Sequence, residues 1–145
     1  FLKNIEVKKK YPDTIIIKIN ETKPMGYIIK DNVKYLLDNS SNLILFKENI
    51  DFKDLPNIFG KEAEINFVNF FNKLEKNNFP NKIIKNYYYF QIGRWDIQLK
   101  NGRVIKFPHN NVTYAIKKSL ELLERKDFEN YKIIDLRVDG KIIVE

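Results

Sequence analysis

The sequence predicts an α+β fold in which two amphipathic helices pack on a mainly antiparallel sheet. Two observations carry this prediction. Short runs of alternating apolar and polar residues are separated by turn-forming Asp, Asn and Gly, which is typical of β-hairpins. Two longer segments instead space their apolar residues three and four apart, which is typical of helices with one buried face.

The first 24 residues are interpreted as the C-terminal part of one structural unit. Leu2, Ile5 and Val7 indicate an apolar turn, and Ile15, Ile17 and Ile19 then alternate with other residues as in a half-buried strand. Pro24 interrupts this pattern, so we place a domain boundary there. Short strands are expected at 27–29, 34–37 and 42–46, with turns at 31–32 and 38–41.

The middle of the chain predicts a helix and a hairpin. The helix covers 62–76, and its apolar face comprises Phe67, Phe70, Phe71 and Leu74. A strand is expected at 83–92, followed by a hairpin over 94–107 whose core-facing residues are Trp95, Ile97 and Leu99. Asn101-Gly102 predicts a type I′ turn, because both residues tolerate positive φ.

The last third predicts a second helix and a second hairpin. Asn111 is the expected N-cap of a helix over 111–126, in which Glu121 and Arg125 can pair on the outside. Its apolar stripe comprises Val112, Ala115, Ile116, Ser119, Leu120 and Leu123. Strands at 133–138 and 141–145 are then expected to meet at a two-residue turn, Asp139-Gly140.

Composition excludes several functional classes. The chain has no cysteine and one histidine, His109, which we expect in a loop, so thiol chemistry is excluded and common zinc sites are disfavoured. Only three serines are present, and the glycines are too scattered to form a phosphate-binding loop. We therefore predict no catalytic, cofactor-binding or metal-binding residues.

The charge leaves one alternative function open. The formal net charge of +7 and the aromatic run 87–90 could serve a basic module that binds single-stranded nucleic acid. Lysines are spread along the chain, however, and a strand would direct these aromatic residues to two faces. We therefore favour a solvated surface and a packed core over nucleic-acid binding.

Several motifs in order resemble the FtsQ/DivIB family of bacterial division proteins. Residues 7–21 with Pro24 resemble the end of that family's polypeptide-transport-associated (POTRA) domain. Leu37-Asp38, then Leu55-Pro56 with Gly60, follow in the family's order. Residues 94–102 and 134–137 resemble the core of its β-domain. The resemblance implies the C-terminal part of a POTRA domain at 1–23 and an FtsQ-type β-domain at 24–145.

The resemblance also implies a function and a location. The chain would be a non-enzymatic division scaffold that binds FtsB- and FtsL-like proteins, in part by adding a partner strand to its C-terminal edge. It would lie on the periplasmic side of the inner membrane, anchored by a single span absent from this sequence, in which no apolar run is long enough to cross a bilayer. Nucleic acid and cofactors are not expected.

The same resemblance indicates which residues meet the partner. Arg94 and Arg137 would contact acidic partner residues, and Ile142, Ile143 and Val144 would supply apolar contacts. The expected partner-binding set is Arg94, Arg137, Val138, Lys141, Ile142, Ile143, Val144 and Glu145. Three positions depart from the family pattern, since Val138 replaces an aromatic residue, Thr22 an arginine and Ser41 a glycine.

Overall fold

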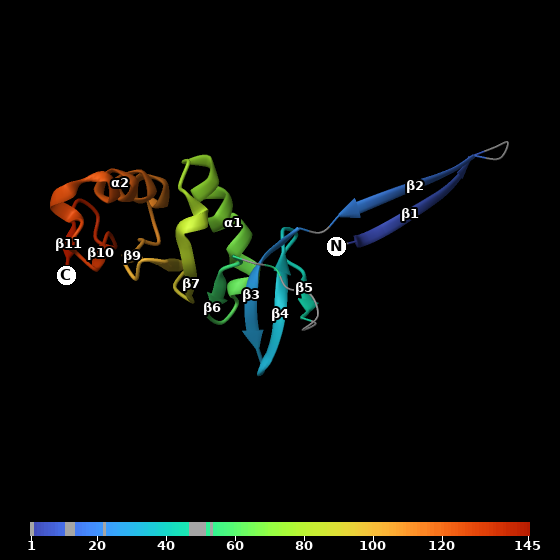
Figure 1. The fold of residues 1–145 in the computed structure, drawn as a ribbon, viewed down its shortest axis with the longest axis horizontal. Coiled ribbons are helices and arrows are strands. Elements are labelled where there is room, and N and C mark those ends of the chain that lie inside the picture. Colours follow the sequence, from blue (N-terminus) through green and yellow to red (C-terminus); the bar gives the residue numbers. More distant parts are fainter. Residues whose placement is uncertain (1, 11–13, 22, 47–51, 53) are drawn as a thin grey trace.

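A computed structural model describes residues 2–10, 14–21, 23–46, 52 and 54–145 (Figure 1). Strands β1 (Leu2–Lys10) and β2 (Thr14–Glu21) pair antiparallel and form a two-stranded sheet of their own. The strand predicted around Ile15 is therefore confirmed as β2. The apolar turn predicted at Leu2, Ile5 and Val7 is wrong, because these residues belong to β1.

The other described strands form one nine-stranded sheet in the order β11-β10-β9-β8-β7-β6-β3-β4-β5. Three neighbouring pairs are parallel (β3 with β6, β6 with β7, and β9 with β10), and the remaining five are antiparallel. The strands are β3 (Pro24–Lys30), β4 (Val33–Asp38), β5 (Leu43–Leu45), β6 (Asn57–Phe59), β7 (Ile84–Phe90), β8 (Arg94–Leu99), β9 (Val104–Lys106), β10 (Ile133–Asp135) and β11 (Ile143–Val144).

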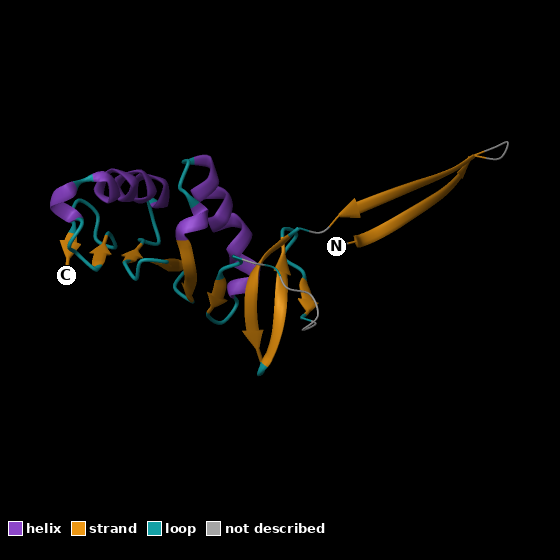
Figure 2. Ribbon diagram, viewed as in Figure 1, coloured by secondary structure: helices purple, strands orange, loops and turns teal. Residues whose placement is uncertain are grey.

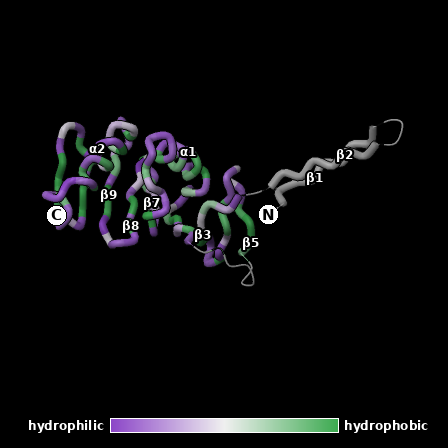
Figure 3. The backbone as a smooth tube through the Cα atoms, turned by 45° about the horizontal axis from the view of Figure 1, so that its top comes forward, coloured by the Kyte–Doolittle hydropathy of each residue, from purple (hydrophilic) through white to green (hydrophobic). Residues whose placement is uncertain are grey.

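Two helices accompany this sheet, α1 (Ala63–Lys76) and α2 (Val112–Glu124) (Figure 2). Short 3₁₀ turns at Asn81–Ile83 and Lys126–Phe128 precede β7 and follow α2. This arrangement confirms the predicted α+β class with a mainly antiparallel sheet and two amphipathic helices. From β3 to the C-terminus, hydrophobic and hydrophilic stretches alternate along the backbone (Figure 3).

The core is aromatic where α1 crosses the sheet. Phe67, Phe70 and Leu74 of α1 are buried as predicted, while Phe71 is half-buried. The Phe67 ring meets Tyr87 edge-on at 4.8 Å between centroids, and Phe70 stacks on Trp95 at 5.3 Å. The predicted core residues of β8 are confirmed, since Trp95, Ile97 and Leu99 are all buried.

Helix α2 departs from the sequence prediction in three details. Asn111 is the N-cap residue, as predicted, but it adopts φ 58° and its side chain makes no capping hydrogen bond. Leu122 is fully buried, whereas the predicted Leu123 is half-buried. Arg125 ends the helix and binds Asp127 rather than Glu121, which pairs with Lys118 at 3.4 Å. The stripe is therefore rotated slightly from the predicted one.

Two predicted turns differ from the structure, one in type and the other in the length of its flanking strands. At the β8–β9 turn only Gly102 has positive φ, and its N–H bonds the Leu99 carbonyl at 2.9 Å. This is a type I turn with a glycine bulge instead of type I′. At the C-terminal hairpin Asp139 and Gly140 are the central residues of a β-turn, as predicted, and the Lys141 N–H bonds the Val138 carbonyl at 3.1 Å. The flanking strands do not reach this turn, because β10 ends at Asp135 and β11 begins at Ile143. Residues 136–142 form a longer loop between them.

Candidate functional site

The face of the sheet opposite the core carries a row of charged residues near the C-terminal edge. Strand register aligns Asp96 of β8 with Lys106 of β9, Lys106 with Asp135 of β10, and Asp135 with Ile143 of β11. Their chain neighbours Ile97, Ile105 and Ile134 are buried in the core. Because side chains alternate between the faces of a strand, the row lies on the opposite face, which we call the open face.

Arg137 is held firmly by Asp135. Its Nε donates to both carboxylate oxygens at 2.9 and 3.1 Å, its Nη2 donates to Oδ2 at 2.7 Å, and its backbone N–H donates to Oδ1 at 3.0 Å. These bonds to Arg137 lower the pKa of Asp135 and raise that of Arg137. The Arg137 side chain keeps 43% of its surface exposed, so this oriented guanidinium can still meet a partner.

Arg94 is far less accessible than the sequence suggested. It forms an ion pair with Asp96, both side chains are about one-tenth exposed, and its guanidinium lies 4.2 Å from the centre of the Phe90 ring. Burial raises the pKa of Asp96, opposed by the hydrogen bond from Arg94. Arg94 thus lies on the open face, because it alternates with the buried Trp95, but its charge is already neutralised by Asp96.

Strand β11 is the outermost strand at this end of the described sheet. Glu145 and Ile133 exchange two backbone hydrogen bonds, both at 3.1 Å, which makes them a hydrogen-bonded antiparallel pair. Because such pairs alternate with non-bonded ones, Val144, opposite Ile134, directs its N–H and C=O away from β10. Those two groups face the open edge and are free to bind an added strand.

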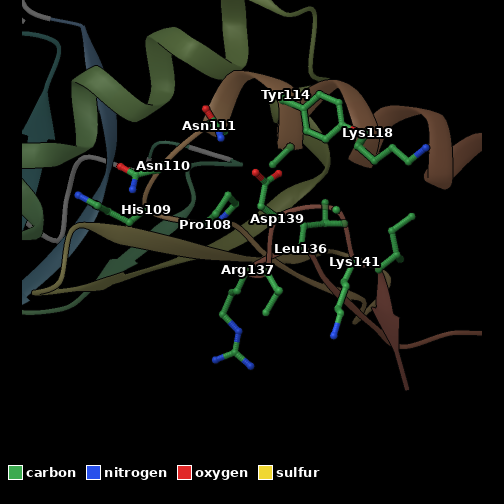
Figure 4. A pocket seen from close by; sticks show the side chains of 14 residues that line it. Pro108, His109, Asn110, Asn111, Tyr114, Lys118, Leu136, Arg137, Asp139 and Lys141 are labelled. Carbon is green, nitrogen blue, oxygen red and sulfur yellow. The ribbon is translucent and has the colours of Figure 1, made fainter.

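The loop 136–142 borders a surface pocket of about 500 Å³. On the loop side Leu136, Arg137, Val138, Asp139, Gly140, Lys141 and Ile142 line it, and on the helix side Pro108, His109, Asn110, Asn111, Tyr114, Ala115 and Lys118 do. The Asp139 carboxylate points towards Tyr114, while the Arg137 guanidinium and the Lys141 amine point away from it (Figure 4). The loop therefore presents different chemistry to the pocket and to the open face.

The predicted partner-binding residues separate into three locations. Arg137, Val138, Lys141 and Ile142 share the loop beside the pocket, and Ile143 and Val144 form β11, followed directly by Glu145. Arg94 lies on β8, three strands from the edge. Val138 is 49%, Ile142 39% and Ile143 46% exposed, so each of these apolar side chains keeps surface available to a partner.

The residues weighed for other chemistry have structural roles. His109 lies in a loop, as predicted, with its Nδ1 3.0 Å from the Gly93 carbonyl oxygen. Tyr87 is fully buried, Tyr89 packs on Trp95 at 4.8 Å, and Tyr88 stacks on Phe59 at 5.2 Å. The described residues contain no group of three His, Asp or Glu placed to hold a metal ion.

Comparison with known proteins decides the family. Residues 26–137 match the family model described as cell division protein FtsQ/DivIB, C-terminal. The chain belongs to the FtsQ/DivIB family. It is 32% identical over 150 residues to the cell division protein FtsQ of Rickettsia bellii and 25% identical over 151 residues to that of Agrobacterium fabrum. Both matches cover all of this chain, but the chain spans only 55% and 46% of the length of those two relatives.

The chain is also similar to a solved structure, that of the major extracytoplasmic domain of the cell division protein DivIB from Geobacillus stearothermophilus. It is 12% identical, with a TM-score of 0.47, and the match covers 67% of this chain and 87% of that one. Membership of the FtsQ/DivIB family assigns the chain a role in bacterial cell division. In the described part of the chain, no helix is both long and apolar enough to span a membrane.

Sequence reasoning missed two features of this candidate site. Lys106 was not singled out, although its alternation with Ile105 and Phe107 places it on the open face. Tyr114 was missed too, although an aromatic residue on the polar side of a helix stripe is a usable signal, and it is 60% exposed beside the pocket. The long-range strand pairing that gives these residues their neighbours could not be read from the sequence.

Proposed function

We propose that this FtsQ/DivIB chain is a non-enzymatic division scaffold that binds a strand of an FtsB- or FtsL-type protein along β11. The single observation that carries the proposal is the outward-facing backbone of Val144 at the edge of the sheet. An added strand would satisfy this N–H and C=O, and the exposed side chains beside them would select the partner sequence.

The surroundings of β11 support this mode of binding. Ile142 and Ile143 offer exposed apolar surface, and Arg137 offers an oriented cation for an acidic partner residue. A charged group held by a bidentate ion pair loses little conformational entropy on binding. The loop and β11 together therefore combine a backbone edge, an apolar contact and a fixed charge.

The location and domain organisation belong to the same proposal. We place residues 1–23 in the C-terminal part of a POTRA domain and residues 24–145 in the β-domain. The whole protein would be anchored in the inner membrane by a single span, with this region on the periplasmic side. The separate pairing of β1 with β2, and the start of β3 at Pro24, support the division at that point.

The test is a proline at Val144. Proline removes the outward N–H of that residue but leaves the hydrogen bonds between Ile133 and Glu145 in place. Binding of the soluble region of the FtsB-type protein from the same bacterium should weaken about tenfold or more, the effect of losing one hydrogen bond and its strand register. Val144→Ala, which keeps the N–H, is the matched control and should bind within about threefold of the wild type. Equal affinity for all three proteins would refute strand addition at β11.

A further inference from the structure

Within the described part of the chain, the charged row on the open face has one cation without an ion-pair partner. Asp96 is occupied by Arg94, and Asp135 by Arg137. Lys106 lies between the two carboxylates in the strand register, yet among the described residues no ion pair within 4.0 Å and no hydrogen bond engages its amine. Three cations thus meet two carboxylates, so the row carries one surplus positive charge.

The two arginine pairs keep this surplus at Lys106. Arg137 is fixed by four hydrogen bonds to Asp135, and Arg94 is nearly buried against Asp96 and Phe90. Asp135 therefore has little capacity left for a third cation, whereas Asp96 accepts one hydrogen bond within the described part of the chain, from Arg94. Lys106 attracts both carboxylates electrostatically without bonding to either. Further along the edge, Lys141 and Glu145 have opposite charges and leave the surplus unchanged.

The position of Lys106 restricts which part of a partner could reach it. Neighbouring strands lie roughly 4.8 Å apart, so a strand added beyond β11 would run about 14 Å from β9. A lysine side chain does not span that distance. A contact with Lys106 requires partner residues that leave the added strand and cross the open face over β10.

We propose that Lys106 is a specificity-determining contact for a carboxylate of the same partner polypeptide, in the segment that flanks its added strand and lies over β9 and β10. This inference rests on the proposed function, because it extends that interface from the edge of β11 onto the open face. Ile143, which ends the row at the edge and is 46% exposed, gives the crossing segment apolar surface beside the charges. If the crossing segment of the partner had no acidic residue, Lys106 would have no opposite charge in the complex.

The inference is tested with the soluble region of the FtsB-type protein and four variants. Lys106→Met removes the charge but keeps the length of the side chain, and should weaken binding about threefold to tenfold while reducing its salt dependence. Lys106→Glu should weaken binding further, because it adds a third carboxylate to the row. Lys106→Arg keeps the positive charge and should bind like the wild type. Lys117→Glu, an equal charge change at an exposed position of α2, is the control and should bind like the wild type.

The outcomes separate the two proposals. If Lys106→Met keeps wild-type affinity and salt dependence while Val144→Pro loses binding, the inference about Lys106 is wrong and strand addition stands. If Val144→Pro binds like the wild type, the proposed function is wrong whatever Lys106 does. Should Lys106→Glu fail to fold, the Lys106→Met affinity and salt dependence decide the question alone.

Discussion

Asp135 is the residue on which the orientation of Arg137 depends. Asp135→Asn removes the negative charge and breaks the bidentate pairing, so we expect it to lower the free energy of unfolding at pH 7 by about 1–3 kcal/mol. Partner affinity should fall as well, because the guanidinium is no longer fixed. Urea denaturation followed by the fluorescence of Trp95, the only tryptophan, measures the stability change. A variant as stable as the wild type would show that the pair has no structural role.

The pH dependence of this effect has a definite sign. The pKa of Asp135 is lowered in the folded protein, chiefly by the hydrogen bonds from Arg137, so its stabilising contribution is fully present above the unfolded pKa of about 3.9. That contribution disappears as the pH falls below 3.9 through the folded pKa. The stability difference between wild type and Asp135→Asn should therefore be constant from pH 7 to about 5 and shrink below about 4. A difference that grows on acidification would contradict this assignment.

Gly60 is required where β6 leads into α1. Its φ is +119°, and a Cβ placed there would lie 2.3 Å from the backbone oxygen of Tyr89, which cannot move without disturbing β7. Gly60→Ala should cost about 2–4 kcal/mol, combining left-handed strain with overpacking. Gly102→Ala separates the two causes, because Gly102 has φ +93° with nothing within 4 Å and should cost only about 1–2 kcal/mol. Equal losses measured by urea denaturation would rule out the clash with Tyr89.

At the scale of elements, α1 fixes the central part of the sheet. Phe67 is fully buried and contacts Tyr87 and Trp95, so Phe67→Ala should cost about 3–5 kcal/mol. Ile65 on the same helix is 68% exposed, and Ile65→Ala should change the stability by less than about 0.5 kcal/mol. Thermal unfolding measured by circular dichroism distinguishes them. Comparable losses in the two variants would mean that α1 is not oriented as described.

The success of sequence reasoning at this scale follows from what each pattern encodes. The spacing of Phe67, Phe70 and Leu74 encodes a helix face directly, and the alternation at Trp95, Ile97 and Leu99 encodes a strand face. Turn geometry depends also on the strands that a turn connects, which is why Asn101-Gly102 does not form the predicted type I′ turn and Asp139-Gly140 turns within a longer loop. Hairpin dipeptides favour a two-residue turn only when both strands continue in register to it.

At the scale of the whole molecule, the sheet depends on pairings that no local pattern contains. The parallel pairs of β3 with β6 and β9 with β10 join segments separated by long stretches of chain, and the second pair brings Lys106 beside Asp135. The open-face row could therefore not be predicted, although each of its members has the expected alternation. The edge position of β11 was expected only from the family resemblance, and strand order now supplies its physical basis.

The separate sheets predict that the larger one folds without the smaller. Strands β1 and β2 pair with each other, and the described strand pairing links neither to β3–β11. The Lys23 carbonyl accepts a hydrogen bond from Asn39 at 3.1 Å, so the fragment should begin at Lys23. Fragment 23–145 should unfold in one cooperative transition, within about 0.5 kcal/mol of the full chain, when Trp95 fluorescence is followed in urea. A broad transition or a loss of several kcal/mol would place the domain boundary elsewhere and make the hairpin of β1 and β2 part of the same folding unit.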